Sequence, residues 1–502
     1  MELDFSSQAH FFLALLPEVV LSAWGMIVLI VGVWKKEEDG RPSADFLGAL
    51  ALVGLLLAAG ANGWLYSVSQ TGGSGMIVVD RFRLFANWIF LLAGAMSILI
   101  SLSYVTRQRL QSAEVYALML FAVVGMMVMG GTHNLIIIFL GLEIMSVAVY
   151  ALAAMNRRDR RSAEAGLKYF LLGAFSTGFF VYGIALAYGA TGSTDIGIMA
   201  RAVLEGATVA PLLLVGVALL AIGFAFKVAA VPFHMWTPDV YEGAPAPITA
   251  FMATGVKAAA FVAFLRVFMV GFDAVYDSWY PILWWLAAIT MVVANLIALV
   301  QPNVKRMLAY SSIAHGGYLM VALVAANEMA SAAMLFYLLV YTLMNVGAFA
   351  IVIIVAHQGE DRLQIEDYAG FGWKQPMLGV FFTIFLLSLA GFPGTGGFMG
   401  KIFLLQGALD SDLWTLAIVL VMATLVSYWY YLRVAWYMWM KEGSDSSAYS
   451  TVLAPFPMRV ALFAGVGLIL FLGIFPGSLL DFIQSSVGSL THVSGFLMGM
   501  AP

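Results

Sequence analysis

The sequence contains no cysteine and little charge. Of its 502 residues none is Cys, and only 10% are Asp, Glu, Lys or Arg, against about 25% in soluble domains. Disulfides, thiolate-bound iron–sulfur clusters and cysteine nucleophiles are therefore excluded. The 24 basic and 28 acidic residues leave a net charge of −4, so no basic surface favours nucleic acid as a partner. The six histidines are scattered without paired spacing, which gives a metal site no support.

Apolar residues make up 62% of the chain, too many for polar residues to cover the surface in water. Fourteen continuous apolar runs are each long enough for a helix of about 20 residues that spans a lipid bilayer. Continuous runs argue against barrel strands, which alternate and are shorter. The sequence predicts an all-α polytopic membrane protein with about 14 transmembrane helices at 11–34, 46–66, 84–104, 115–131, 134–155, 165–189, 211–241, 247–270, 280–300, 307–325, 330–356, 376–409, 412–439 and 460–482.

The distribution of basic residues predicts the orientation of these spans, because cytoplasmic loops carry an excess of Lys and Arg. With the N-terminus outside, fifteen of the 24 basic residues fall in inside loops and three in outside loops, and six lie within spans. We therefore expect both termini on the outer side.

Two of the runs are too long for one span and are interrupted. Residues 211–241 contain KVAAVPFH at 227–234, and residues 376–409 contain GFPGTGGFMGK at 391–401. Proline removes a backbone donor and glycine weakens a helix, so each run predicts a broken helix beside protein or a wet cavity. A packing kink is the alternative, but each break lies a few residues from a lysine.

The two breaks are five spans apart, so spans 4–8 and 9–13 form two candidate five-helix repeats. Because five is odd, the second repeat is expected to be inverted relative to the first, as in many transporters. The expected organisation is a three-helix segment at 1–110, the two repeats at 111–271 and 272–440, and a C-terminal helix and tail at 441–502.

Ionisable residues fall near the middle of several spans, although a charge at the bilayer centre costs roughly 2.5–3.5 kcal/mol. Glu143 and Lys227 are candidates for a buried ion pair, with a structural salt bridge as the alternative reading. Burial makes an amine easier to deprotonate, by several pKa units when it is complete. We therefore predict that Lys257 and Lys401 carry protons, with snorkelling or an anion site as alternatives.

Other ionisable residues leave two readings open. His234 and His315 are either relay groups or hydrogen-bonded structural histidines, since a histidine titrates near neutral pH. Lys168 either snorkels to the inner interface or takes part in proton uptake or pairs with Glu143. Glu18 is expected in the first turn of a helix, near the interface.

One segment carries a resemblance to a known family. Residues 227–251, KVAAVPFHMWTPDVYEGAPAPITAF, resemble the signature of the antiporter-like, proton-translocating membrane subunits of respiratory complex I. The run TPDVYEGAPAP at 237–247 is most similar to subunit N of bacterial NADH–quinone oxidoreductase, and LPEVVL at 16–21 and GLEI at 141–144 fit as well. Lys401 disfavours the sister subunit M, which carries glutamate there, and the chain length disfavours subunit L.

The resemblance implies a proton-translocating subunit of a bacterial cytoplasmic (inner) membrane complex, with a proton path from the cytoplasm to the outside. It implies no cofactor in this chain, because FMN, iron–sulfur clusters and quinone belong to partner subunits. The implied partners are subunits M and K, the peripheral arm and the lipid bilayer. The implied site consists of Glu143, Lys227, Lys257, Lys401, His234, His315 and Lys168.

Three other functions remain open at this stage. They are a subunit of a multisubunit Na⁺/H⁺ antiporter of the Mrp type, a subunit of a related membrane-bound hydrogenase or oxidoreductase, and a stand-alone secondary transporter. Sodium favours clustered oxygen ligands, and Glu143 is the only acid deep in the predicted repeats, which counts against the antiporter.

Overall fold

The N-terminal part consists of long helices and a small hairpin. The computed structural model describes residues 8–34, 43–68, 72–74, 76–110, 112–206, 210–356, 362–442 and 454–499. Lys35, Lys36 and Arg41, which entered the prediction of orientation, lie outside this part. The first elements are α1 (Gln8–Ala14), α2 (Leu16–Trp34), α3 (Ala44–Val68), β1 (Gly72–Ser74), β2 (Ile77–Val79) and α4 (Arg81–Arg107). The two strands pair antiparallel, with Gly73 opposite Val78.

Two further groups of helices follow. The first consists of α5 (Ser112–Gly130), α6 (Leu135–Ala153), α7 (Arg160–Thr191), α8 (Ile196–Leu204), α9 (Ala210–Lys227), α10 (Trp236–Gly243), α11 (Ala246–Phe251), a π-helical turn (Met252–Val256), α12 (Lys257–Arg266), a second π-helical turn (Val267–Gly271) and a short turn (Asp273–Val275). The second consists of α13 (Tyr276–Leu299), α14 (Val304–Ala325), α15 (Glu328–Val355), a turn (Ile365–Tyr368), α16 (Phe371–Lys374), α17 (Pro376–Ala390), α18 (Gly396–Asp410) and α19 (Trp414–Met440). The chain then adds α20 (Phe456–Ile474) and α21 (Gly477–Gly499).

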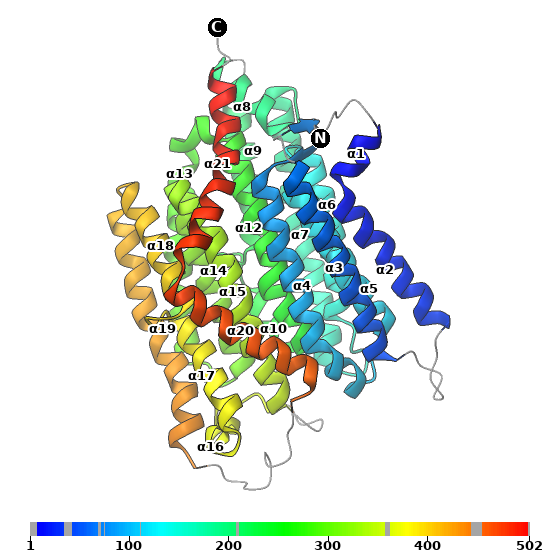
Figure 1. Cartoon of the computed structure of the whole chain (residues 1–502). Coiled ribbons are helices and arrows are strands. Elements are labelled where there is room, and N and C mark those ends of the chain that lie inside the picture. Colours follow the sequence, from blue (N-terminus) through cyan, green and yellow to red (C-terminus); the bar gives the residue numbers. More distant parts are fainter. Residues whose placement is uncertain are drawn as a thin grey trace.

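The predicted all-α polytopic architecture is confirmed. Thirteen helical stretches among the described residues are long and apolar enough to cross a membrane, and α17 is a shorter apolar helix. The predicted run 376–409 is divided between α17 and α18, and the run 211–241 between α9 and α10. The prediction missed α21: the last run, 460–482, continued past the end of α20 into this helix, which packs against α4 and α15 (Figure 1).

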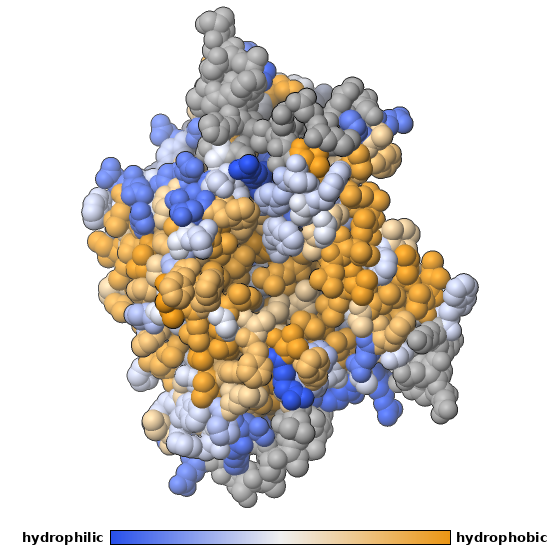
Figure 2. Space-filling model, viewed as in Figure 1, coloured by the Kyte–Doolittle hydropathy of each residue, from blue (hydrophilic) through white to orange (hydrophobic). Residues whose placement is uncertain are grey.

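On the face seen in Figure 2, apolar residues form a belt between two polar ends. Large apolar side chains on helices long enough to cross a membrane are exposed, such as Leu56, Phe175 and Trp429, at 71%, 68% and 67%. A surface of this kind is unfavourable in water and favourable against lipid. The first described helix, α1, and the end of α21 lie toward the same end of the molecule (Figure 1).

Three helical stretches form the buried centre. Every residue of 246–271 is buried except Met269, and α14 and α15 are buried along nearly their whole length. A helix that is apolar on all sides belongs inside a large protein or a membrane. Polar groups on these stretches are therefore screened from lipid by the surrounding helices.

The first helix break lies between α9 and α10, where the chain leaves the helix after Lys227. Ala229 has a φ of +62°, in the left-handed region that residues with a side chain seldom adopt. The backbone N–H of Val231 donates to Thr290 Oγ1 at 2.9 Å, and Trp236 Nε1 donates to the carbonyl of Phe226 at 3.2 Å. Side chains of neighbouring elements thus satisfy groups that the break releases, as the apolar surroundings require.

The second break lies between α17 and α18. Gly391 and Gly394 have φ values of +89° and +84°, which glycine adopts without steric cost. Tyr428 donates to the carbonyl of Gly391 at 2.7 Å. The amine of Lys401 donates to the last carbonyls of α17, those of Leu389 and Ala390, at 3.1 and 2.9 Å. The lysine after the break therefore caps the helix before it.

Candidate functional site

Four of the predicted site residues lie in the buried centre of the molecule. Their relative exposures are 4%, 2%, 1% and 5% for Lys227, Lys257, His315 and Lys401, respectively. Lys227 ends α9, Lys257 begins α12, His315 lies in α14 and Lys401 lies in α18. These groups are separated by up to 174 positions in the sequence (401 − 227). Two helix breaks and two central helices bring them to the interior.

Lys227 lies against α6, but its partners differ from the expected one. Its amine donates to Ser146 Oγ at 2.8 Å and to the hydroxyl of Tyr150 at 3.1 Å. Glu143 instead accepts a hydrogen bond from Thr177 Oγ1 at 2.8 Å and is only partly buried. Among the described residues no ion pair joins Glu143 to Lys227, so the expected pair was wrong for this structure.

The reason lies in the geometry of α6. Ser146 comes one turn after Glu143 on the same side of the helix, and it lies nearer the core. Val147, one helical turn after Glu143, is 60% exposed, so Glu143 lies at the boundary between the buried and the exposed side of α6. From the sequence we predicted that Glu143 lies within a membrane-spanning helix, but the direction in which its side chain points could not be predicted.

Lys257 lies between the first break and α14. Its amine donates to Ser312 Oγ at 2.6 Å and also to the carbonyl of Ser312. A Cβ on Gly316 would lie 3.0 Å from the carbonyl oxygen of Val228 and 3.8 Å from Lys257 Nζ. The absence of a side chain at Gly316 therefore lets the backbone of the first break approach α14 beside the Lys257 amine.

His315 lies between two tyrosines from different helices. Its Nδ1 is 2.7 Å from the hydroxyl of Tyr337, and its Nε2 is 3.0 Å from the hydroxyl of Tyr431. The Lys401 amine lies 4.8 Å from the ring centroid of Tyr318, whose ring is 5.3 Å from that of His315. His315 is therefore placed between Lys257 on one side and Lys401 on the other.

The partners of these three lysines are all uncharged in the structure. They are hydroxyls and backbone carbonyls, and no carboxylate lies within ion-pair distance of Lys227, Lys257 or Lys401 among the described residues. An amine held only by neutral acceptors keeps them when it loses its proton, whereas an ion pair opposes that loss. The arrangement suits reversible protonation.

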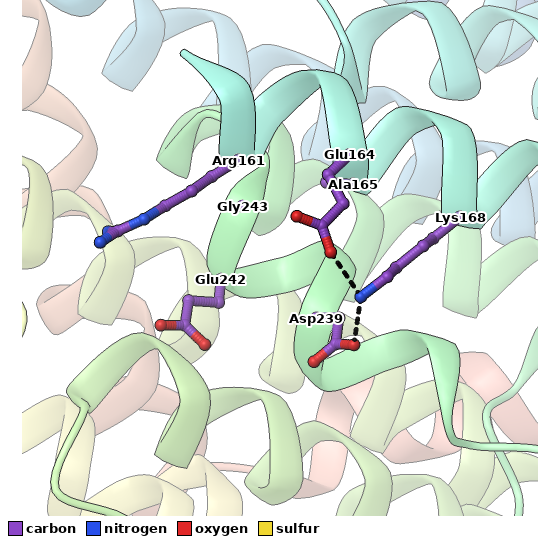
Figure 3. Close-up of a pocket in the computed structure, with 7 residues that line it drawn as sticks. All are labelled: Arg161, Glu164, Ala165, Lys168, Asp239, Glu242 and Gly243. Atoms are coloured by element: carbon purple, nitrogen blue, oxygen red, sulfur yellow. Dashed lines mark hydrogen bonds and ion pairs between the residues drawn. The ribbon is translucent and has the colours of Figure 1, made fainter.

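Lys168 and His234 lie apart from this row. Lys168 Nζ is 2.7 Å from Glu164 and 2.9 Å from Asp239, in a surface pocket of about 200 Å³ (Figure 3). Its side chain is 41% exposed, and it does not contact Glu143. His234 is half-buried within the first break, and among the described residues its Nδ1 has no hydrogen-bond partner.

The same pocket gathers further charges at one polar surface. Arg306 Nη1 is 3.0 Å from Asp239 and 2.9 Å from Glu242. Figure 3 shows the Lys168 amine between Glu164 and Asp239, while Glu242 lies on the other side. Asp239 and Glu242 belong to α10, so the pocket lies directly beyond the first break.

A buried cluster of charges lies beside the hairpin, and the sequence reasoning missed it. Arg266 forms two hydrogen bonds with Asp80, at 2.7 and 2.9 Å, and its Nη1 is 2.9 Å from His133 Nε2. Arg83 pairs with Glu18 at 2.6 Å. Glu18 is in the first turn of α2, as expected, and it is 3% exposed because it pairs with Arg83.

This cluster joins the N-terminal part to the helices that follow. Asp80 caps α4 by accepting from the N–H of Arg83, while Arg266 ends α12. Burial alone would raise the pKa of Asp80, but the charge and hydrogen bonds of Arg266 overcome that effect and hold it below its usual value. Burial and the Arg266 charge lower the pKa of His133 to about 4.

The comparisons with known proteins agree with the geometry. The family described as NADH:quinone oxidoreductase/Mrp antiporter, TM, matches residues 132–427. NADH-quinone oxidoreductase subunit N of Trichlorobacter lovleyi is 46% identical over 476 residues, which cover 94% of this chain and 96% of that one. The chain belongs to the subunit N family of NADH–quinone oxidoreductases. A second subunit N, from Solibacter usitatus, is 42% identical over 95% of this chain and 97% of that one.

Solved structures share the fold of this subunit N family member. A chain of respiratory complex I from Thermus thermophilus with bound aureothin matches with a TM-score of 0.78 and 34% identity, covering 94% of this chain and 100% of that one. A chain of the archaeal membrane-bound sulfane sulfur reductase matches with a TM-score of 0.86 and 25% identity, covering 97% and 99%. A chain of the Mrp complex from Dietzia has a TM-score of 0.80 at 20% identity, covering 96% and 99%, which shows a common fold alone.

The family assignment confirms the resemblance on which the site was predicted. The matched segment, 132–427, contains all seven predicted site residues, from Glu143 to Lys401. The buried charge cluster extends beyond it, since Glu18, Asp80 and Arg83 precede residue 132. One feature of the sequence could have indicated the cluster, namely acidic and basic residues in or next to apolar stretches: Glu18, Asp80, Arg83 and Arg266.

We predict that Arg266→Ala destabilises the chain by about 3–5 kcal/mol, because it leaves the carboxylate of Asp80 buried without a partner. The measurement is the thermal denaturation midpoint of the purified membrane complex. Arg81→Ala is the matched control, since Arg81 directly follows Asp80 in the chain but is exposed. Equal midpoints for the two variants would show that the Arg266–Asp80 pair does not stabilise the fold.

We predict that His133 makes the protein less stable in mild acid. With a pKa of about 4 in the folded chain and about 6.5 when unfolded, the unfolded state binds more protons between these values. The contribution of the neutral His133 side chain to the free energy of unfolding is complete above pH 6.5 and is lost as the pH falls toward 4. The denaturation midpoint of His133→Gln, which keeps an acceptor for Arg266, should therefore fall less than that of the native chain between pH 7 and pH 4.5. Parallel curves would contradict the assignment.

Proposed function

We propose that the chain translocates protons across the bacterial cytoplasmic (inner) membrane as a subunit of an NADH–quinone oxidoreductase. Lys227, Lys257, His315 and Lys401 carry the protons. The observation that supports this proposal best is the set of buried amines whose only partners are neutral hydroxyls and carbonyls. Oxidation of NADH and reduction of quinone take place in other subunits, which hold FMN and the iron–sulfur clusters.

Protons are taken up at the charged pocket beyond the first break. Lys168, Asp239 and Glu242 line this pocket, and Asp239 and Glu242 lie in the helix that follows the break. From there a proton reaches the region of His234 and Lys227, then Lys257, His315 and Lys401. The excess of basic residues in the loops of this side supports its assignment to the cytoplasm, with both termini outside.

The two halves of the chain act as inverted units. Residues 111–271 contain the break after Lys227, and residues 272–440 contain the break before Lys401. A broken helix with a lysine close to the break occurs in each half, before the first break and after the second, and this supports an inverted repeat with 1–110 and 441–502 as additions at either end. Each unit thus supplies one half of the proton path, and His315 lies where they meet.

Several interacting charges together can supply the free energy that is needed to move a proton against the membrane potential. Moving one charge against 100 mV costs about 2.3 kcal/mol. Two charges about 8 Å apart interact by about 2 kcal/mol at an effective dielectric constant of 20. One electrostatic switch is therefore barely sufficient for one proton, and successive changes at Lys227, Lys257 and Lys401 supply a larger total.

Glu143 faces a neighbouring membrane subunit. Its carboxylate lies at mid-membrane on a partly exposed surface, with Thr177 as its hydrogen-bond partner, and Leu140 and Val147 beside it are 46% and 60% exposed. Such a carboxylate is costly against lipid, so a partner subunit with a donor or a cation would cover it. Subunits M and K are the proposed neighbours, in a membrane arm that joins the peripheral arm.

The Mrp-type antiporter is the less favoured alternative. The likeness to the Mrp chain concerns the fold alone, at 20% identity. Two further acids are buried, Glu18 and Asp80, but each is paired with an arginine and lies away from the row of lysines. A cluster of free oxygen ligands, which sodium would require, is not found among the described residues of this row.

We predict that Lys227→Ala and Glu143→Ala each lower the number of protons pumped per NADH oxidised, because each removes a charge that governs the first part of the path. The measurement is proton uptake by membrane vesicles that contain the assembled complex. Lys441→Ala, at an exposed lysine, is the control and should pump normally. Full stoichiometry in either of the first two variants would count against that residue.

We predict that Lys401→Glu retains part of the pumping activity, whereas Lys401→Ala loses it. A carboxyl group can also load and release a proton, while a methyl group cannot. The same vesicle assay decides between them. If the two variants pump equally poorly, the role of Lys401 depends on its amine, such as its bonds to the carbonyls of α17.

A further inference from the structure

The surroundings of His315 contain an unusual concentration of buried hydroxyl groups. Tyr337 and Tyr431, which touch its two ring nitrogens, are 0% and 1% exposed and come from α15 and α19. The hydroxyl of Tyr431 also forms a hydrogen bond with Ser311 Oγ. Ser311 and His315 are four residues apart on α14, so the Tyr431 hydroxyl bridges two groups on one face of that helix.

The chemistry of imidazole makes this arrangement directional. A neutral imidazole has one nitrogen that donates and one that accepts. Of the two phenols, one must therefore accept from His315 while the other donates to it. Two arrangements exist, Tyr431-to-His315-to-Tyr337 and the reverse, and they differ only in the position of the protons.

Each end of this chain leads to one of the lysines. Ser311 is next to Ser312, whose oxygens accept from the amine of Lys257. At the other end, a Cβ on Gly400 would collide with the ring of Tyr337, so this ring lies directly against the residue before Lys401. The two ends of the hydrogen-bonded chain thus lie beside the partner of Lys257 and beside the residue that precedes Lys401, without a hydrogen bond to either lysine among the described residues.

We propose that Tyr337 and Tyr431 are proton-transfer residues, and that protons pass between Lys257 and Lys401 through the chain Ser311–Tyr431–His315–Tyr337. This inference rests on the proposed function and adds two groups to it that carry no charge. The two phenol hydroxyls determine the route that a proton takes through the centre of the molecule.

The step balances without any other reactant. The O–H bond of Tyr431 breaks as an N–H bond forms at Nε2 of His315, and the proton on Nδ1 moves to the oxygen of Tyr337. Tyr431 regains a proton from Ser311, whose own proton is replaced by one that the ammonium group of Lys257 releases, while the original proton of Tyr337 is taken up by the neutral amine of Lys401. No phenolate remains, and reorientation of the hydroxyls and the ring restores the starting arrangement.

Packing alone does not require these hydroxyls, and the chain provides matched comparisons. Tyr116 of α5 is fully buried, and its ring lies against Gly48 of α3. Tyr368 is also fully buried, and its ring lies 5.8 Å from that of Phe382. Phenylalanine at any of these positions keeps the ring, so only loss of the hydroxyl is tested.

Several titratable groups face this chain from the elements packed around it and enter the interpretation of any pH profile. They are Lys257 on α12, Lys401 on α18, Tyr318 on α14, Tyr341 on α15, Tyr430 on α19 and Tyr241 on α10. Each remains in place in the variants below.

The test is the rate of proton pumping per assembled complex, in vesicles supplied with NADH and quinone. Tyr337→Phe and Tyr431→Phe should each lower this rate as far as Lys401→Ala does, while Tyr116→Phe and Tyr368→Phe, at buried tyrosines outside the chain, leave it near the native rate. Normal pumping by both Tyr337→Phe and Tyr431→Phe would overturn the proposal. An equal loss in all four variants would also overturn it, because it would indicate a purely structural role.

A second measurement addresses a structural role directly. Replacing Tyr337 or Tyr431 by a ring-fluorinated tyrosine keeps the hydroxyl and makes it more acidic. The pH profile of pumping should then shift to lower pH, and the fluorinated residue at position 116 should leave the profile unchanged. An unshifted profile at both 337 and 431 would overturn the proposal.

The result can be separated from a failure of the proposed function. Lys257→Ala and Lys401→Ala in the same assay test whether protons pass through this chain at all. If these two variants lose pumping while the tyrosine variants keep it, the relay exists but does not use the phenols. If the lysine variants pump at the native rate, the proposed function itself is wrong.

Discussion

The structure depends on one constraint: polar groups inside a lipid-embedded protein must find their partners within the protein. Each helix break releases backbone carbonyls, and the lysine beside the second break takes up two of them. The amine of Lys401 therefore cannot be treated as a charge placed in an apolar core by itself. It is part of the means by which the chain tolerates a broken helix at that depth.

The chain uses basic residues in two different ways. In the cluster beside the hairpin, Arg266 and Arg83 hold carboxylates at 2.6–2.9 Å, and arginine does not release its proton. In the central row, Lys227 and Lys257 contact only hydroxyls and carbonyls. The first arrangement stabilises a junction between helices, and the second leaves the protonation state free to change. Both lie in buried surroundings, so the difference comes from the residue type and its partner.

The hydroxyl groups around His315 relate the second of these arrangements, the lysines with neutral partners, to proton transport. Three lysines in one protein interior repel each other when all are protonated, and a neutral histidine between hydroxyl groups separates two of them. Tyr337 and Tyr431 fix both nitrogens of the ring, which keeps the histidine in a position where either nitrogen can exchange a proton. Glu143, at the edge of the chain, provides the contact through which a neighbouring subunit can influence Lys227.

The sequence alone determined the class of fold, the location of the lysines within apolar helices and the two broken helices, because apolar run length and Pro/Gly positions report directly on membrane helices. It also pointed to the family through residues 227–251. The tertiary structure decided which side chains meet. It separated Glu143 from Lys227, since helix rotation sends the two toward different neighbours, and it brought Arg266 to Asp80 across 186 residues. Such pairings depend on how helices pack around one another, and no periodicity within a single span encodes them.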